Sequence, residues 1–423
     1  MCLQVPLNPI DNVLAALDHT LQRQDGIGFN CVLTLMLEGE LNRGRLIDAA
    51  RRLGECHVLT RARLHKPRWA RHPRWVVEPA ATIPIEFEEA TADTEPAPLA
   101  ETILNRKLDP RDDPPVQIFA RRLQSGCHVL ILKWSHVLTD GRGGDFLLQA
   151  LGRYYAGLDP SPPRPTPRPE GLSVGQPKPR WPRPPACSVN LCRLWGAPSA
   201  NRLRLRVVAL DEAESAALRR HATAVAGFGR QGIAMLGAAF RLMQRQALAA
   251  DYRHATVRAH WPVALREGAL PASLPGNEFG FVYLERPVNE HLDDAALAEQ
   301  LTREIIDQLR RGEHRRAWVL ARWLWLYRYA RLCKLNDRSR FLIRGDRSTM
   351  HFRYAGRLIG GAREWGGLPV RGGFAATICW PEKPLALGLS ETAGRFHVGV
   401  TWLEGALTDQ AADQLIHQFR QEL

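Results

Sequence analysis

Apolar runs and alternating patterns in the first 156 residues predict a mixture of strands and helices. The run NCVLTLMLEGEL at 30–41 predicts a strand, and the amphipathic stretch that follows it predicts a helix. Two apolar runs separated by Gln124-Ser125-Gly126 predict a β-hairpin. The expected strands cover 30–41, 57–64, 74–78, 116–123 and 127–134, and the expected helices cover 42–55, 99–107 and 142–155.

The second half has the same texture. Asp211 and Glu214 form a capping-box pattern, which predicts that a helix begins there. The expected strands cover 202–210, 255–265, 279–286, 349–354, 374–380 and 395–403, and the expected helices cover 211–225, 232–248, 292–311, 315–334 and 408–423. Mixed elements in both halves predict an α/β (α+β) chain with two similar lobes.

A proline-rich segment separates the two halves. Residues 157–185 hold 11 of the chain's 30 prolines, so this segment can form neither a helix nor a central strand. We therefore expect an N-terminal lobe at 1–156, a crossover linker at 157–186 and a C-terminal lobe at 187–423.

Composition narrows the class of protein. The chain has 423 residues and a formal net charge of +13, and only six of its 57 basic residues are lysine. Arginine pairs well with phosphate and carboxylate, so the charge fits a phosphate-bearing partner, although arginine-rich coding would explain it equally well. The chain has no run of 18 apolar residues and no visible secretory signal, so we expect a cytoplasmic protein. The eight cysteines lack zinc-ligand spacing, and we expect no metal.

The sharpest chemical signal is the sequence from Trp134 to Gly141, which reads WSHVLTDG. It lies between an apolar strand and a helix, where a side chain can be held rigidly and still face a cleft. His136 is the one side chain there that titrates near neutral pH, which suits a general base. Asp140 can fix the turn by accepting hydrogen bonds, and Gly141 tolerates conformations that a side chain forbids.

This H-x-x-x-D-G pattern resembles that of the chloramphenicol-acetyltransferase-like superfamily, which includes condensation domains of peptide synthetases and several acyltransferase groups. The resemblance covers nearly the whole chain. Further similar segments are the opening Pro9-Ile10-Asp11, HVLTRAR at 57–63, WPVALR at 261–266, Gly276-Asn277 and FRYAGRL at 352–358. The resemblance implies two lobes, each a mixed sheet with helices, arranged as a pseudo-dimer around a central channel.

The resemblance also implies roles for individual residues. His136, Asp140 and Gly141 would form the catalytic motif: His136 would take the proton of the acceptor, and the backbone N–H of Gly141 would help to stabilise the oxyanion. Asp140 would form a structural salt bridge with Arg266. We expect Ser135, Gly276 and Asn277 to line the substrate channel.

Three functions remain open at this point. The first is an acyltransferase that moves an acyl group from coenzyme A or an acyl carrier protein to a hydroxyl or amine, in lipid or natural-product biosynthesis. The second is a free-standing condensation enzyme that forms an amide from carrier-bound substrates, and the third is a non-catalytic interaction module on the same fold. We expect no bound cofactor, because acyl-CoA or acyl-phosphopantetheine would be a co-substrate.

An acidic acyl carrier protein and peripheral membrane contact are candidate partners, and no nucleic acid is expected.

Three other patterns have competing interpretations. The segment RRAWVLARWLWLYRYARLCK at 315–334 could lie at a membrane surface, but its apolar residues recur at helical spacing and favour a core helix. The G-x-S-x-G match at 171–175 lies in the linker, which is the wrong context for a nucleophile elbow. The G-x-G-x-x-G match at 227–232 follows a helix, so a helix–helix loop is favoured over a dinucleotide site.

Overall fold

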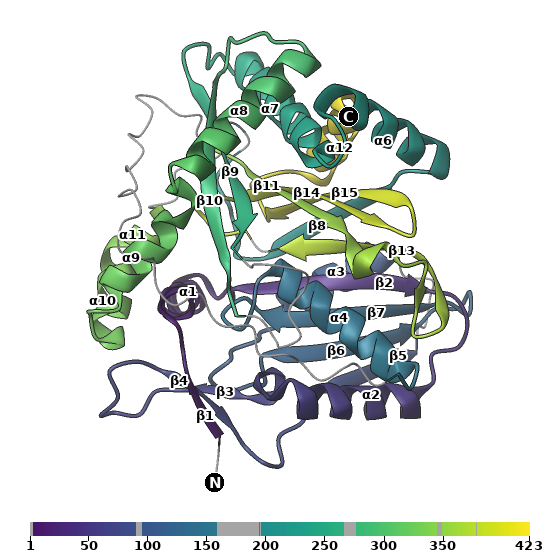
Figure 1. Ribbon diagram of the computed structural model, residues 1–423, viewed down its shortest axis with the longest axis vertical. Helices are drawn as coiled ribbons and strands as arrows, with labels where there is room; N and C mark the ends of the chain where they lie inside the picture. The colour runs from purple at the N-terminus through teal and green to yellow at the C-terminus, as the bar shows by residue number, and fades with distance from the viewer. Residues whose placement is uncertain are drawn as a thin grey trace.

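The computed structural model describes residues 3–89, 95–158, 194, 196–265, 276–344, 349–377 and 379–423. Two layered units lie one above the other, each with a sheet and covering helices (Figure 1). The expected linker at 157–186 lies outside the described residues, apart from its first two positions. The G-x-S-x-G match at 171–175 also lies outside the described residues.

The lower unit is built on a six-stranded sheet with the order β12-β13-β2-β7-β6-β5. Its strands are β2 (Asn30–Leu37), β5 (Ile85–Glu89), β6 (Val116–Arg122), β7 (His128–Ser135), β12 (Glu364–Trp365) and β13 (Leu368–Thr377). All pairs are antiparallel except β5 with β6. Every residue of β7 is buried, as a central strand requires.

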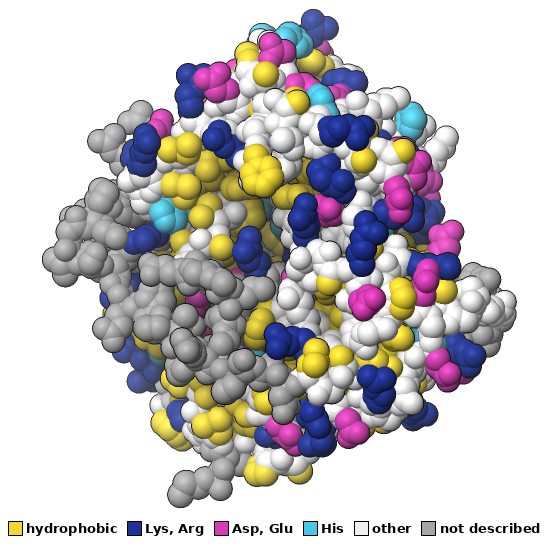
Figure 2. All heavy atoms as spheres, turned by 45° about the vertical axis from the view of Figure 1, so that its right-hand side comes forward, with side chains coloured by type: hydrophobic (Ala, Val, Ile, Leu, Met, Phe, Trp, Pro, Cys, Tyr) yellow, Lys and Arg dark blue, Asp and Glu magenta, His cyan; other side chains and the backbone are white. Residues whose placement is uncertain are grey.

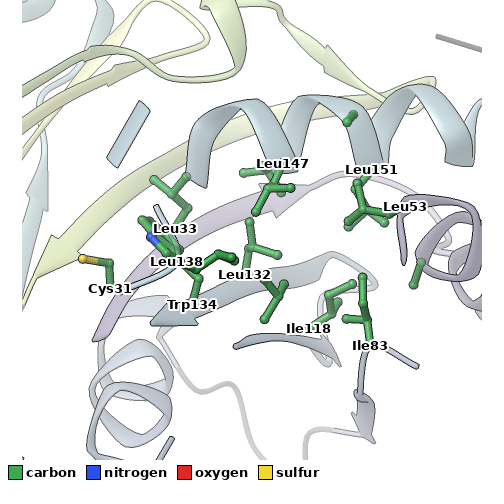
Figure 3. Close-up of a cluster of buried hydrophobic side chains, with 14 of the residues drawn as sticks. Cys31, Leu33, Leu53, Ile83, Ile118, Leu132, Trp134, Leu138, Leu147 and Leu151 are labelled. Carbon is green, nitrogen blue, oxygen red and sulfur yellow. The ribbon is translucent and has the colours of Figure 1, made fainter. Parts of the chain in front are cut away.

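Helices cover both faces of this sheet. The helices are α1 (Pro9–Thr20), α2 (Arg43–Cys56), α3 (Pro96–Asn105) and α4 (Gly141–Tyr155). Helix α4 packs on the sheet and on α2 through Leu147 and Leu151, which meet Leu132 and Leu53 in one apolar cluster (Figure 3). A small sheet of β1 (Leu3–Pro6), β4 (Arg74–Val77) and β3 (Arg63–His65) lies at the lower end of the unit.

The upper unit combines a four-stranded sheet, a two-stranded ribbon and a helical layer. The sheet has the order β11-β14-β15-β8, and the ribbon pairs β10 with β9. The strands are β8 (Leu203–Ala209), β9 (Thr256–Ala264), β10 (Phe279–Pro287), β11 (His351–Arg357), β14 (Leu385–Thr392) and β15 (Arg395–Leu403). The helices are α6 (Glu212–Ala226), α7 (Gln231–Ala249), α8 (Asp294–Arg310) and α12 (Asp409–Glu422).

The second half of the chain contributes two strands to the lower sheet. Strand β13 belongs to the second half of the sequence, yet it pairs with β2 in the lower sheet from Thr377 opposite Cys31 to Val370 opposite Leu37. A shared apolar cluster also joins Val32 and Ile131 of the lower unit to Leu205 and Leu403 of the upper one. The lobes in space therefore differ from a simple division of the chain at the proline-rich segment.

The segment at 315–334 differs from its prediction. It forms two helices, α9 (Arg316–Leu324) and α10 (Tyr329–Ser339), with short α11 (Phe341–Arg344) after them. The chain turns between them because Arg328 is extended. The prediction that this segment is core is wrong for much of its apolar surface, since Leu320, Trp323, Leu326 and Tyr327 are exposed. Helical spacing identifies a stripe but does not say whether anything covers it.

Two other sequence predictions agree with the structure. Gly227 and Gly229 have φ of +86° and +78° in the short loop between α6 and α7, so the glycine-rich match is a helix–helix loop. The capping box of Asp211 and Glu214 is present at the start of α6. In the described part of the chain, no helix is long and apolar enough to cross a membrane.

Candidate active site

The H-x-x-x-D-G loop runs from the end of β7 to the start of α4. His136 continues the strand pairing, because its backbone N–H donates to the carbonyl oxygen of Phe29 at 2.7 Å. The buried indole of Trp134 donates to the carbonyl oxygen of Thr139 at 3.1 Å, which closes the turn from inside. Asp140 is the N-cap of α4, and its Oδ1 accepts from the N–H of Gly143 at 3.0 Å. The loop is therefore rigid.

Two phenylalanines from different lobes hold the His136 ring. Phe29 stacks on it with the ring centroids 4.6 Å apart and an interplanar angle of 8°. Phe279, at the start of β10, meets it edge-on at 5.8 Å. The imidazole is half-buried between the lobes, so it can be reached and is still shielded from bulk water.

Asn277 in the upper lobe sets the orientation and tautomer of this ring. Its Oδ1 lies 3.0 Å from Nδ1 of His136. Its Nδ2 faces three oxygens: Oδ1 of Asp11 at 2.9 Å and the carbonyl oxygens of His136 at 2.8 Å and Val137 at 3.3 Å. An amide nitrogen can only donate, so Oδ1 must accept from His136. Nδ1 therefore carries the proton of the neutral ring, and the lone pair is on Nε2.

Asp11 of α1 supports this arrangement from behind. Its carboxylate is buried, and its Oδ1 accepts from both the side-chain amide and the backbone N–H of Asn277. Asn8 caps the same helix by accepting from the N–H of Asp11 at 2.7 Å. The N-terminal helix thus fixes the upper-lobe residue that orients the His136 ring.

The electrostatic environment keeps His136 neutral. Burial of the ring, which disfavours its charged form, lowers the pKa of His136 below its ordinary value. The Arg353 guanidinium acts in the same direction, whereas the Asp140 carboxylate and the hydrogen bond with Asn277 act in the opposite one. At neutral pH the ring is therefore available as a base.

Asp140 has a structural place in this site. Its Oδ1 caps α4, while Oδ2 accepts from the backbone N–H of Glu278 at 3.3 Å and so joins the loop to the upper lobe. Arg266, the partner expected from the resemblance, lies outside the described residues, so the pairing of Asp140 with Arg266 stays a prediction.

Gly141, the first residue of α4, makes room for a charged side chain from the other lobe. A Cβ at this position would overlap Nη2 of Arg353, which comes from β11. The side chain of Arg353 is half-buried, and its positive charge acts on both His136 and Asp145.

Of the three expected channel residues, Ser135 lies elsewhere. Its side chain is fully buried, and its Oγ accepts from the N–H of Val137 at 3.3 Å, so it stabilises the turn and does not line a channel. Asn277 is likewise fully buried but touches the His136 ring directly. Gly276 is half-buried beside the Asp11 carboxylate.

Aromatic rings from both lobes form a closed chain of contacts that begins and ends at His136. After Phe29 it passes through Trp380, then two histidines from β11 and β9, and returns through two phenylalanines of β10. Neighbouring centroids are 4.6–6.2 Å apart in the order His136, Phe29, Trp380, His351, His260, Phe281, Phe279. Most of these rings are far apart in the sequence, and the sequence patterns did not identify them as parts of one site.

Away from His136, charged side chains are spread over the surface of the protein. Lys and Arg side chains occur over much of the face in Figure 2, with Asp and Glu side chains among them. In the residues that the structure describes, no group of three or more His, Cys, Asp or Glu side chains could hold a metal ion.

Comparison with known proteins gives two partial sequence matches among curated proteins. The chain is 28% identical over 141 residues to tyrocidine synthase 3 of Brevibacillus parabrevis, and 26% identical over 135 residues to gramicidin S synthase 2 of Brevibacillus brevis. These matches cover 33% and 31% of this chain, but only 2% and 3% of the two synthases. No protein-family model matches.

Solved structures match over almost the whole chain. The first condensation domain of the calcium-dependent antibiotic synthetase, in complex with a substrate analogue, gives a TM-score of 0.69 at 16% identity and covers 99% of this chain and 95% of that one. The starter condensation domain of rhizomide synthetase, with C8-CoA and Leu-SNAC, gives 0.65 at 13% identity, with 99% and 93% covered. Polyketide synthase associated protein 5 of Mycobacterium tuberculosis gives 0.62 at 15% identity, with 99% and 96% covered.

These matches confirm the fold expected from the resemblance. The chain has the two-lobed fold of the condensation domains that it matches. Its matched sequence relatives are named as synthases, and its matched solved structures include a condensation domain of a synthetase and a polyketide synthase associated protein.

Proposed function

We propose that the protein catalyses a condensation in which an acyl group passes from a thioester to an amine or hydroxyl acceptor. The observation that carries this proposal is the state of His136: neutral, protonated on Nδ1 by its contact with Asn277, and with Nε2 available between two lobes of a condensation fold. An imidazole in this state can accept a proton from an attacking nucleophile.

The reaction would proceed in balanced steps. The acceptor N–H or O–H gives its proton to Nε2 of His136 while its nitrogen or oxygen forms a bond to the thioester carbonyl carbon. The tetrahedral intermediate carries negative charge on the former carbonyl oxygen, near the positive end of α4 and Arg353. The C–S bond then breaks, the carbonyl reforms, and the thiolate takes the proton back from His136 to leave as a thiol.

An amide product has more support than an ester from the comparisons. The matched sequence relatives are named as synthases of the peptides tyrocidine and gramicidin S, and one matched structure contains C8-CoA together with Leu-SNAC, which bears an amine. We therefore propose an amine as the first acceptor to test and a hydroxyl as the second. Acyl-CoA and acyl-phosphopantetheine are both proposed donors, the latter on an acidic carrier protein.

The test measures acceptor-dependent release of free thiol from acyl-CoA and acyl-N-acetylcysteamine donors, with panels of amines and alcohols. We expect His136→Ala to lower the rate about 100- to 10,000-fold, the usual contribution of a positioned base. His254→Ala, which changes an exposed histidine remote from the loop, is the matched control and should keep full activity. Equal rates for the two variants would contradict the assignment of His136 as the base.

A further inference from the structure

Helices α9 and α10 carry an unusual share of the molecule's exposed apolar surface. Eleven large hydrophobic side chains are exposed among the described residues, and five of them lie within residues 320–335. Three are more than half exposed, with 66% for Trp323, 59% for Leu326 and 51% for Tyr327. Together with Leu320 and Leu335, these residues define the α9–α10 face. Large apolar side chains that are exposed together in one short segment often mark an interaction site.

The opposite side of the same helices is firmly attached to the protein. The Tyr329 hydroxyl donates to the carbonyl oxygen of Ala15 in α1 at 3.0 Å, and the indole of Trp325 stacks on His72 with centroids 3.7 Å apart. Trp318 donates to the carbonyl oxygen of Phe279 at 3.1 Å. The exposed side chains therefore stand on an anchored element and are not exposed by fraying of a helix end.

The charge around the α9–α10 face has a single sign. From His314 to Asn336 the sequence contains six lysines and arginines but no aspartate or glutamate. Five exposed cations border the apolar side chains and make no ion pair with any described residue, namely Arg322, Arg328, Arg331, Lys334 and Arg338. The two acids that flank this stretch are already paired, Glu313 with Arg316 and Asp337 with Arg23. The face thus attracts a negatively charged partner.

We propose that the α9–α10 face docks the protein on an anionic lipid surface. The two helices lie at the left edge of the molecule in Figure 1, and the side chains of the α9–α10 face are exposed. Trp and Tyr side chains favour the headgroup level, leucines favour the acyl boundary, and flanking Lys and Arg attract anionic headgroups. Helix α9 has nine residues, so this contact lies on the membrane and does not cross it.

The proposed docking face lies close to the candidate active site. Trp318 of α9 holds the backbone of Phe279, whose ring contacts His136, and Tyr329 of α10 holds α1, which carries Asp11 behind Asn277. A lipophilic acyl donor or acceptor dissolved in the bilayer would therefore meet the protein beside its site. The docking itself does not depend on the proposed acyl transfer, because it can be measured without substrate.

The experiment measures co-sedimentation of the full chain with vesicles of phosphatidylcholine alone and of phosphatidylcholine with phosphatidylglycerol. We expect binding to the anionic vesicles, weaker binding to the neutral ones, and loss of binding at high salt. The double variant Arg328→Gln/Arg331→Gln should bind the anionic vesicles about 30-fold more weakly, at roughly fivefold per charge. Trp323→Ser/Tyr327→Ser should weaken binding about tenfold or more.

Matched controls change the same residue types elsewhere. Phe228→Ser removes an aromatic side chain that is 92% exposed in the loop after α6, and Arg303→Gln/Arg310→Gln removes two exposed arginines of α8. Both controls should bind as the unchanged protein does. Absence of vesicle binding, or equal losses in the control and α9–α10 variants, would overturn the proposal. Tighter binding to soluble poly-glutamate than to the anionic vesicles would also overturn it, in favour of an acidic protein partner.

Discussion

The two sides of the candidate active site are built in different ways. On the lower side, His136, Asp140 and Gly141 come from six consecutive residues between β7 and α4. On the upper side, Asn277 and Arg353 are 76 positions apart in the sequence, and each reaches the loop only because the upper lobe folds. The lower side carries the proposed base, and the upper side orients its ring and adds to the burial that lowers its pKa. The proposed reactive group therefore comes from one short segment, whereas the residues that orient it come from distant parts of the sequence.

The largest expected effect comes from removing the orienting amide while leaving the base in place. Asn277→Ala should lower kcat about 100-fold, because the ring loses the acceptor that fixes its tautomer and the site loses its alignment, while KM changes much less. Steady-state kinetics of thiol release measure both constants. An unchanged kcat would mean that the lower side alone is sufficient for catalysis and that the upper side is not needed to orient His136.

The next effect concerns packing beneath the loop. Gly144→Ala should lower the free energy of unfolding by about 1–2 kcal/mol, because the new Cβ would overlap the buried Trp134 ring. The cost of this overlap is larger than the gain in helix propensity from replacing glycine with alanine. Gly44→Ala, at an exposed position of α2, is the matched control and should be neutral or stabilising. Urea unfolding measures both. If Gly144→Ala and Gly44→Ala changed the free energy of unfolding equally, the Trp134 ring would be able to shift and accommodate the new Cβ at little cost.

Asp140 should be mainly structural. Asp140→Ala should cost about 1 kcal/mol as a lost helix N-cap and should also lower kcat, because the loop loses its link to the backbone of Glu278. Thr408→Ala removes the equivalent cap of α12, remote from the site, and should cost similar stability with unchanged kcat. If both variants kept full activity, the bond across the lobes would have no part in positioning the loop.

The smallest effect is a shift in pH dependence. Because the base must be neutral and the pKa of His136 is lowered, kcat/KM should fall only as the pH drops through a value below 6.5 and stay flat near pH 7. Arg353→Gln removes a cation that lowers this pKa, so the acid limb should move to higher pH. Arg357→Gln, an exposed arginine paired with Glu391, should leave the profile in place. Identical profiles for all three proteins would exclude Arg353 from the electrostatics of the base.

The local side of the site could be predicted from the sequence, because strand, turn and helix follow one another and leave His136 at the strand end. Asn277 was expected only as a channel residue, since nothing in a sequence shows which side chain it will meet 141 positions away. Arg353 lies in the FRYAGRL segment singled out at 352–358, but nothing in that pattern gives this side chain a place beside His136. The 315–334 segment shows the same limit, because apolar residues at helical spacing predict a helix without predicting which face is covered.

Strand β13 has a consequence for how the chain is made. It lies between β12 and β2, so the lower sheet stays incomplete until the ribosome has released residues up to Thr377. Until then, β2 presents an unpaired edge of almost entirely buried apolar side chains, which invites strand addition from another nascent chain. The newborn protein must therefore protect this edge for most of its synthesis, and any fragment that stops in the proline-rich segment keeps it permanently open.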